Sequence, residues 1–313
     1  MRAFSSLPHD LDIHGHHDVG VVSPLESYVR LVVGPCAVVD RPRTKGVTRV
    51  IEVRDQNGLS WFGKRLHVPR QWEGETSAYR WWGGLEDRVP RVVDQHQELR
   101  ALVTARLPGQ PADPGDPAAF RRAGALLSRM HAVTPARDDG GEWLRSTWAA
   151  ARFETARCRR LEVPVDERLV YACLDRLTEL PALPVALCHG DFMPHNWLVD
   201  DAGEVRTMDF AEAGWRPVAY DFARLRFGPC WDRPELYDAF VEGYGRELTD
   251  DEEAFVALHL AVNATTAVGW GTEQDRPLVR DRGMEVLGRL AAGKPYPARR
   301  SLRRRTPGLR RWV

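Results

Sequence analysis

The segment CHGDFMPHN (residues 188–196) lies between two apolar runs, VAL at 185–187 and WLV at 197–199. Short apolar runs bounded by turn-forming residues indicate buried strands. The loop between them carries Asp191 and Asn196, a carboxylate and a carboxamide five residues apart. Polar groups on a loop that two buried strands hold in place are candidates for catalysis or binding.

The residues after this loop predict a hairpin. The DDAG stretch (200–203) is rich in turn-forming residues, and the following strand ends at Asp209. A hairpin of this length returns Asp209 to the neighbourhood of Asn196. Carboxylate and carboxamide oxygens are ligands that Mg²⁺ prefers. Zinc is not indicated, because no Cys pair or H-x-x-x-H spacing accompanies these residues.

The spacing from Asp191 to Asn196 is D-x-x-x-x-N, which matches the catalytic loop of protein kinases. In that pattern the aspartate takes the proton of the acceptor hydroxyl and the asparagine holds metal, with a second metal-binding aspartate downstream. Asp209 fits the downstream position. Phosphoryl transfer needs these residue types, because a base must meet the attacking oxygen and cations must neutralise the phosphates. A serine hydrolase is not indicated, since no G-x-S-x-G is present.

The composition is that of an ordinary globular protein. The 313 residues are 43% hydrophobic and 28% charged, and 44 basic residues balance 44 acidic ones. This balance indicates no nucleic acid or membrane partner, and we find no apolar run near the roughly 20 residues that cross a bilayer. Five scattered cysteines without a CxxC pair favour reduced thiols in the cytoplasm.

Two unlike regions follow one another along the chain. Residues 28–65 have the composition of strands, with a hairpin signal, DQNG, at 55–58. We expect a helix over residues 71–82 and a last strand over residues 98–107. The PGQP stretch at 108–111 then breaks the pattern and is the best candidate for an interlobe linker.

The remainder is predicted to be mostly helical. Asp116 and Pro117 supply an N-cap and a first helical residue, and Thr249 with Glu252 forms a capping box. The order is therefore a small β-rich lobe, a linker and a larger helical lobe. Apolar residues at helical spacing mark three helices, which carry Phe120, Ala123, Leu127 and Met130, then Leu169, Cys173, Leu177 and Leu180, then Phe255, Leu258 and Val262.

Three motifs together identify a family resemblance. HGD at 189–191 with Asn196, MDF at 208–210 and YDFA at 220–223 closely resemble the aminoglycoside phosphotransferase and choline kinase-like family. The resemblance covers roughly residues 40–290 and implies an α+β, two-lobed protein kinase-like fold. HGD alone is a weak signal, whereas the whole segment LCHGDFMPHNWLVDDAGEVRTMDF is specific.

The resemblance implies roles for the residues of these motifs. Asp191 is the catalytic base that orients the acceptor hydroxyl, and Asn196 and Asp209 bind Mg²⁺. His189 supports the catalytic loop, and Asp221 holds that loop through hydrogen bonds without touching substrate. His195, beside Asn196, is open to two interpretations, metal binding or loop packing, of which we favour packing.

The resemblance also places ATP on the small lobe. Lys64 stands where the family keeps the lysine that contacts the α- and β-phosphates, and Glu75 stands at the position of its paired glutamate, with Glu73 as an alternative. An ammonium that a carboxylate holds stays charged and points at the phosphates.

The LVTARLPG stretch (102–109) resembles the hinge that reads the adenine edge, which makes Thr104 and Arg106 candidate nucleotide contacts. No G-x-G-x-x-G precedes the hairpin. The TKGVT stretch (44–48) has one glycine, Gly46, which is the candidate for the phosphate-covering loop.

The acceptor pocket is expected downstream of the catalytic segment. Polycationic acceptors need carboxylates as counter-charges, and tryptophans can stack on substrate rings. Arginines are interleaved with these carboxylates, so the pattern does not require a polycation. The candidates are Glu212, Trp215, Trp231, Asp232, Trp270 and Glu273, with Glu235 and Asp275 as further carboxylates.

These observations predict an ATP- and Mg²⁺-dependent O-phosphotransferase that acts on a small-molecule hydroxyl. We favour an antibiotic of aminoglycoside, nucleoside or peptide type as the acceptor, which would give resistance or self-protection. The alternatives are a kinase of a small metabolic alcohol, such as a choline- or homoserine-like compound, and an inactive kinase-like binding protein. ATP is not distinguished from GTP, nor one oligomeric state from another.

The expected division of the chain has four parts. Residues 1–27 form a flexible N-terminal extension and residues 28–107 the nucleotide-binding lobe. Residues 108–297 form the catalytic and acceptor-binding lobe, and residues 298–313 a basic tail in which a solvated end is favoured over a nucleic acid or lipid contact.

Overall fold

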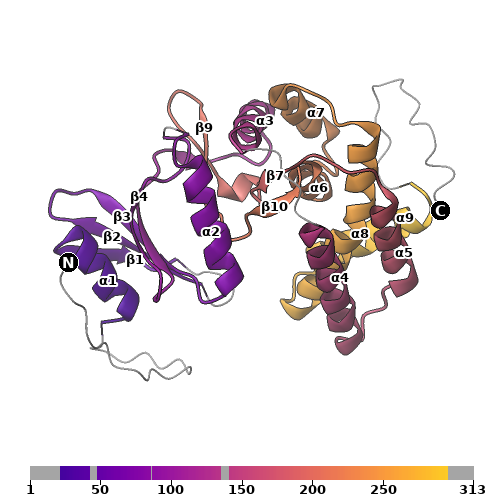
Figure 1. The fold of residues 1–313 in the computed structure, drawn as a ribbon, viewed down its shortest axis with the longest axis horizontal. Coiled ribbons are helices and arrows are strands. Elements are labelled where there is room, and N and C mark those ends of the chain that lie inside the picture. Colours follow the sequence, from indigo (N-terminus) through magenta and orange to yellow (C-terminus); the bar gives the residue numbers. More distant parts are fainter. Residues whose placement is uncertain (1–21, 43–47, 86, 135–140, 295–313) are drawn as a thin grey trace.

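A five-stranded antiparallel sheet, in the order β1-β2-β3-β5-β4, forms the small lobe. The computed structural model describes residues 22–42, 48–85, 87–134 and 141–294. Figure 1 shows the sheet at one end of the molecule and the helices of the large lobe at the other. The strands are β1 (Cys36–Asp40), β2 (Arg49–Asp55), β3 (Ser60–Arg65), β4 (Val92–His96) and β5 (Ala101–Ala105).

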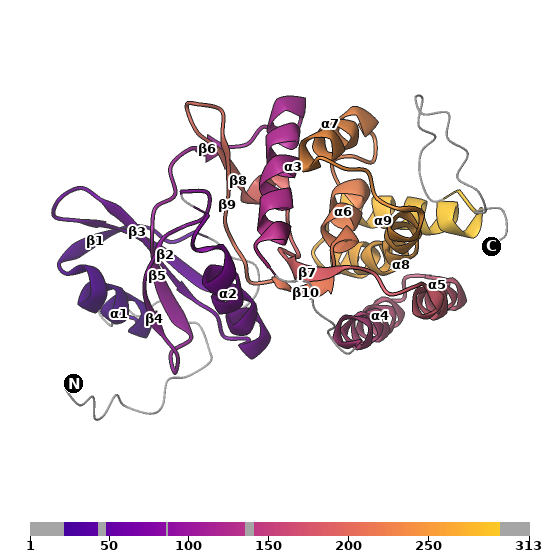
Figure 2. The ribbon, with the colours of Figure 1, turned by 45° about the horizontal axis from the view of Figure 1, so that its top comes forward.

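Alternation along β3 directs its side chains to two different helices. A Cβ at Gly63 would lie 2.3 Å from Cγ2 of Val29, so this position faces helix α1 (Pro24–Val33). The next residue, Lys64, faces the other side and reaches helix α2 (Pro69–Trp82). The two helices therefore cover opposite faces of the sheet, as Figures 1 and 2 show. The predicted hairpin is confirmed between β2 and β3.

The prediction of strands from residue 28 onward is wrong for residues 28–33, which belong to α1. Ser23 accepts a hydrogen bond from the backbone N–H of Glu26 and caps the helix. The valine-rich end of this segment suggests a strand, but burial of Leu25 and Val29 follows a helical spacing of four residues. Strand β4 is not predicted from the sequence, because three of its five residues carry polar side chains.

The chain enters the large lobe directly after β5. The short strand β6 pairs with β8, and β8 pairs with β9, which confirms the predicted hairpin after the catalytic loop. A second antiparallel pair joins β7, which precedes the loop, to β10, which follows the hairpin. The bounds are β6 (Gln110–Pro111), β7 (Val185–Cys188), β8 (Trp197–Val199), β9 (Val205–Thr207) and β10 (Gly214–Pro217).

Helices make up the rest of the large lobe. Asp116 caps α3 by accepting the backbone N–H groups of Ala118 and Ala119, and the capping box of Thr249 and Glu252 is present at the start of α8. α3 packs along α7, and α8 packs against α6 and α9. The helices are α3 (Pro117–Ala132), α4 (Glu142–Arg160), α5 (Glu167–Glu179), α6 (Ala219–Phe227), α7 (Pro234–Tyr244), α8 (Asp250–Glu273) and α9 (Pro277–Ala291).

Among the described residues, α8 alone is long and apolar enough to cross a membrane by length and composition. Most of that stretch is buried inside the protein. A core helix of a large helical lobe has the same composition, and the packing of α8 against α4, α6 and α9 accounts for it.

Helix α2 connects the two lobes. A Cβ at Gly74 would lie 2.7 Å from the carbonyl oxygen of Ala213, so only glycine allows α2 to approach the loop that follows Asp209. At the end of the same helix, Nε1 of Trp82 donates to the carbonyl oxygen of Met130 in α3 at 3.0 Å. α2 is therefore positioned by the large lobe as well as by the sheet.

Candidate active site

The loop after β7 depends on a glycine at one point. Gly190 has φ +81°, and a Cβ at this position would lie 2.1 Å from the carbonyl oxygen of Glu212. A side chain is excluded by both the backbone conformation and the close approach. This turn leads through Asp191, which is partly exposed, into the 3₁₀ turn η1 (Pro194–Asn196).

A buried carboxylate holds the loop. Asp221 accepts the backbone N–H groups of His189 at 2.9 Å and Gly190 at 2.8 Å, and its side chain is fully buried. His131 lies 3.3 Å from the same carboxylate. Burial opposes the charge of Asp221, but the hydrogen bonds and the nearby histidines outweigh it and lower its pKa. This is the geometry that the sequence predicted for Asp221.

His189 lies beneath the loop as a neutral side chain. Its Nε2 is 3.1 Å from Oγ1 of Thr207 and 3.2 Å from the carbonyl oxygen of Met208, while its Nδ1 accepts the N–H of Asp191. Burial lowers the pKa of His189 although nearby carboxylates oppose this. The imidazole therefore ties the catalytic loop to the end of β9.

Both carboxylate oxygens of Asp191 have partners. Arg224 donates to Oδ1 at 2.6 Å, and His195 and the side chain of Asn196 each lie 3.1 Å from Oδ2. Burial would raise the pKa of Asp191, but the hydrogen bond from His195 and the charge of Arg224 hold it well below its usual range. The carboxylate is ionised and partly exposed.

Lys64 joins the two lobes. Its Nζ lies 2.6 Å from Oε2 of Glu75 in α2 and 2.7 Å from Oδ1 of Asp209 in the large lobe. Burial disfavours the ammonium, but the two carboxylates raise the pKa of Lys64 and keep it charged. The structure thus pairs Lys64 with Glu75, whereas the alternative, Glu73, is exposed.

The oxygen atoms near Asp209 fit a divalent cation. The N–H of Met208 donates to the carbonyl oxygen of Asn196 at 3.1 Å, which sets Asp209 beside the catalytic loop. Asp209 has φ +66°, an unusual conformation for a residue with a side chain, and its side chain is 55% exposed. Asn196 donates through Nδ2 to Asp191, so its amide oxygen is the ligand atom that it offers. An all-oxygen donor set of this kind suits Mg²⁺.

The other predicted nucleotide contacts, Thr104 and Arg106, lie at the C-terminal end of β5. Thr104 is buried on β5 between Phe62 and Val92 of the neighbouring strands. The backbone N–H of Arg106 donates to Ser60, and its guanidinium pairs with Glu52 at 2.9 Å. Gly46 lies outside the described residues.

The predicted acceptor residues do not form one acidic pocket. Glu212 contacts Arg70 at 2.8 Å and Gln71 at 3.2 Å, both in α2. The remaining candidates lie against three other helices or on β10. Asp232 pairs with Arg282 of α9, Trp231 is buried and donates to Glu285 at 3.1 Å, Glu273 lies 3.4 Å from Arg160 of α4, Trp270 lies in α8, and Trp215 on β10 packs edge to face against Trp81.

Three residues of the site were missed by the sequence analysis or given a weaker role. His131 supports Asp221 from α3, and Arg224 reaches Asp191 from α6. His195, for which packing was favoured, is 61% exposed and hydrogen-bonds to Asp191. Arg224 immediately follows the YDFA motif, which was the available signal.

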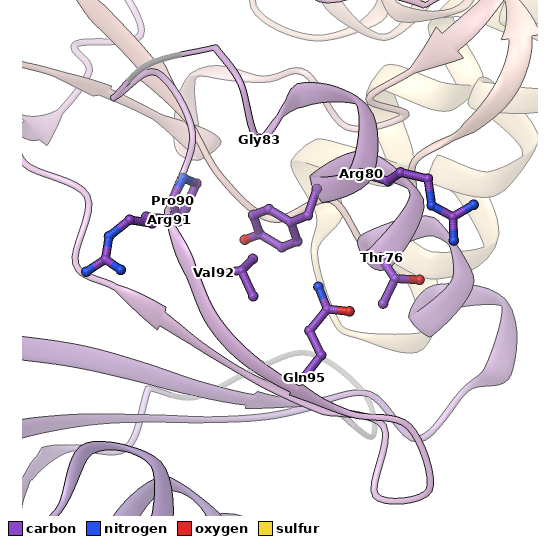
Figure 3. Close-up of a pocket in the computed structure, with 8 residues that line it drawn as sticks. Thr76, Arg80, Gly83, Pro90, Arg91, Val92 and Gln95 are labelled. Carbon is purple, nitrogen blue, oxygen red and sulfur yellow. The ribbon is translucent and has the colours of Figure 1, made fainter.

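A separate cavity of about 380 Å³ lies behind α2. Figure 3 shows Thr76 and Arg80 on the helix and Arg91, Val92 and Gln95 on the facing segment. The cavity contains none of the residues predicted for catalysis. It lies between α2 and the segment that forms β4.

A two-lobed arrangement with a lysine–glutamate pair, a loop aspartate and oxygen ligands on a neighbouring turn defines a kinase-like protein. Solved structures have the same fold at low sequence identity, under 25%. An amicoumacin kinase in complex with AMP-PNP and Ca²⁺ matches with a TM-score of 0.63 and 16% identity, over 87% of this chain and 93% of that one. An aminoglycoside phosphotransferase from Alicyclobacillus acidocaldarius matches with a TM-score of 0.57 and 18% identity, over 89% and 98%. A choline kinase from Streptococcus pneumoniae matches with a TM-score of 0.62 and 14% identity, over 85% and 99%.

The chain belongs to the phosphotransferase enzyme family, whose model matches residues 42–258. The predicted family and the predicted kinase-like fold are thereby confirmed. Among curated proteins, no sequence matches this chain significantly.

Proposed function

We propose that this protein transfers the γ-phosphoryl group of ATP to a hydroxyl group of a small molecule. The observation that carries this proposal is the contact of Lys64 Nζ with both Glu75 and Asp209. Asp209 lies beside Asn196, because the neighbouring Met208 donates to the carbonyl oxygen of Asn196. A kinase-like binding protein without activity has no need to retain this complete set.

Each of these residues has a distinct task in the proposed reaction. Lys64, held charged by Glu75, binds the phosphates of the nucleotide. Asp209 and Asn196 would hold Mg²⁺, which when bound neutralises charge on the phosphates. Asp191 orients the acceptor hydroxyl and takes its proton as the acceptor oxygen attacks the γ-phosphorus. The bond to the bridging oxygen breaks, and ADP leaves.

The proposed acceptor is an antibiotic, and the proposed outcome is resistance or self-protection. Two of the solved proteins with this fold are an amicoumacin kinase and an aminoglycoside phosphotransferase, which supports the choice. A choline kinase with the same fold supports the second candidate, a metabolic alcohol. We place the reaction in the cytoplasm, because all five cysteines are free thiols, as in a reducing compartment.

A turnover assay with a panel of hydroxylated compounds tests the proposal. With Mg²⁺ and ATP, we expect ADP to form together with an acceptor whose mass has increased by one phosphate group. Asp191→Asn should lower turnover about 10²–10⁴-fold and leave nucleotide binding intact. The matched control is Asp201→Asn, an exposed aspartate in the turn of the same segment. Unchanged turnover in Asp191→Asn would remove Asp191 from the role of base.

A further inference from the structure

Arg224 occupies one of the two carboxylate oxygens of Asp191. Its guanidinium lies 2.6 Å from Oδ1 of Asp191, while His195 and Asn196 engage Oδ2. A hydroxyl that donates its proton to Asp191 needs one of these oxygens. Arg224 is 38% exposed at its side chain, so it can move without unpacking the core.

The face of α8 near Arg224 contains buried polar atoms without partners. Within the described chain, Nδ1 of His259 and Nδ2 of Asn263 are buried and make no hydrogen bond. Both residues lie on one face of α8, since they are four residues apart. Buried polar atoms are nearly always satisfied in folded proteins. These two atoms therefore point to a polar ligand bound at this face.

The same surface carries positive charge. Arg216 stacks over Tyr220 at 4.3 Å, and Tyr220 in turn contacts His259 at 4.8 Å. Burial, followed by the charges of Arg216 and Arg224, lowers the pKa of His259 to about 3. His259 is thus a neutral hydrogen-bonding group between two arginines.

Carboxylates that could bind a cationic acceptor are already neutralised. Glu212, Asp232 and Glu273 each pair with an arginine from a different helix. An ammonium group would meet the guanidinium of Arg224 beside Asp191 and little free counter-charge. The local electrostatics therefore disfavour a polycation.

We propose that Arg224, His259 and Asn263 form the acceptor-binding surface, and that the acceptor carries an anionic oxygen group beside its reacting hydroxyl. The anionic group, a carboxylate or phosphate, takes Arg224 away from Asp191 and so frees Oδ1 for the hydroxyl. This inference rests on the proposed phosphotransferase function and adds the chemical class of the acceptor.

The arginine acts as a positioning residue in this scheme. When the acceptor binds, its hydroxyl proton passes to Asp191, its oxygen bonds to the γ-phosphorus, and ADP leaves with the electrons of the broken bond. Without an acceptor, Arg224 covers Oδ1 and keeps Asp191 from activating water. The same step on water would release ADP and inorganic phosphate.

The first experiment measures ATP hydrolysis without any acceptor. Arg224→Gln should raise the rate several-fold, because an oxygen of Asp191 becomes available to water, and adding Asp191→Asn should abolish the increase. Arg121→Gln, which removes an exposed arginine of α3 paired with Glu242, is the matched control and should leave the rate unchanged. A rate that is unchanged or lower in Arg224→Gln would overturn the proposal.

The second experiment measures binding by ligand-observed NMR with three probes that share two hydroxyl groups and carry an anionic, a neutral or a cationic third group: glycerate, glyceramide and 3-amino-1,2-propanediol. Glycerate should bind most tightly to the wild type. Arg224→Gln should weaken glycerate binding about tenfold or more and leave the amine unaffected, and Arg224→Lys should restore most of the loss. Equal affinities for the three probes, or preference for the amine, would overturn the proposal.

The two proposals fail in different ways. A wild-type protein that neither binds nor consumes ATP would remove the phosphotransferase function itself. A protein that phosphorylates an acceptor in an Asp191-dependent manner, but prefers an amine and ignores Arg224→Gln, would remove only the inference about the acceptor.

Discussion

The loop at residues 188–196, for which we propose catalysis, and the side of the large lobe that we propose binds the acceptor are built in opposite ways. In the loop, Asp191, Asn196 and Asp209 meet within one strand–loop–strand segment, where hydrogen bonds between near neighbours join Asn196 to Asp191 and Met208 to Asn196. On the acceptor side, contacts join distant parts of the chain, such as Asp191 to Arg224 and Glu212 to Arg70.

The two regions also differ in how their carboxylates are paired. Asp191 in the loop and Asp221 beneath it accept hydrogen bonds from other groups of the protein. These hydrogen bonds and the nearby positive charges lower the pKa of both carboxylates. Glu212 and Asp232, which were predicted for an acceptor pocket, have exposed side chains that are paired with long arginine side chains. The first kind of pair holds the loop in one geometry, and the second kind cancels charge at little gain in stability.

The largest effect that tests this comparison is expected at Asp221. Replacement by alanine leaves the N–H groups of His189 and Gly190 without their acceptor in a buried position. We expect a loss of about 3–5 kcal/mol in the free energy of unfolding, measured by urea denaturation, together with loss of turnover. Asp201→Ala, in an exposed turn, is the control. A loss below about 1 kcal/mol would mean that the loop is held by other contacts.

A smaller effect is expected at Glu75. Glu75→Gln removes the charge that holds Lys64 toward the phosphates. Turnover, measured as ADP formation with a saturating acceptor, should fall about 10–100-fold, since hydrogen bonds to charged groups contribute about 1.5–3 kcal/mol. Glu73→Gln, on the exposed side of the same helix, should have little effect. The reverse order would make Glu73 the partner of Lys64.

His259 predicts a pH dependence of stability on the acceptor side. Its pKa is lowered to about 3 in the folded protein, so the unfolded chain binds a proton that the folded one does not. The stability is therefore fully present above about pH 6.5 and falls with decreasing pH by up to about 1.4 kcal/mol per unit. Urea denaturation at pH 7, 6, 5 and 4 should show a shallower fall in His259→Gln. Parallel pH profiles for the two proteins would contradict this.

The smallest effect is expected at Glu212. Glu212→Gln breaks an exposed pair with Arg70, which should change stability by less than about 1 kcal/mol. The KM for the acceptor should change less than about threefold, because Glu212 neutralises an arginine of the protein. A tenfold rise in KM for an aminated acceptor would instead restore Glu212 to the acceptor pocket, as the sequence analysis first placed it.

Sequence reasoning succeeded for the features that neighbouring residues in the chain determine. The capping box at Thr249, the hairpin at residues 55–58 and the pairing of β8 with β9 follow from local rules, and all are present. The prediction failed for α1, where a valine-rich stretch after Ser23 hid a capped helix. It also missed Arg224, because its place directly after the YDFA motif does not single out one arginine in a chain with 41 of them.

The sequence by itself determined the catalytic loop, the hairpin after it and the order of the two lobes. These depend on the types and spacing of residues that are close in the chain, so local geometry brings them together. Only the tertiary structure decided that Glu75 is the partner of Lys64, that His131 supports Asp221, and that arginines neutralise the carboxylates of the acceptor side. Those contacts join elements far apart in sequence, whose approach depends on how the helices pack.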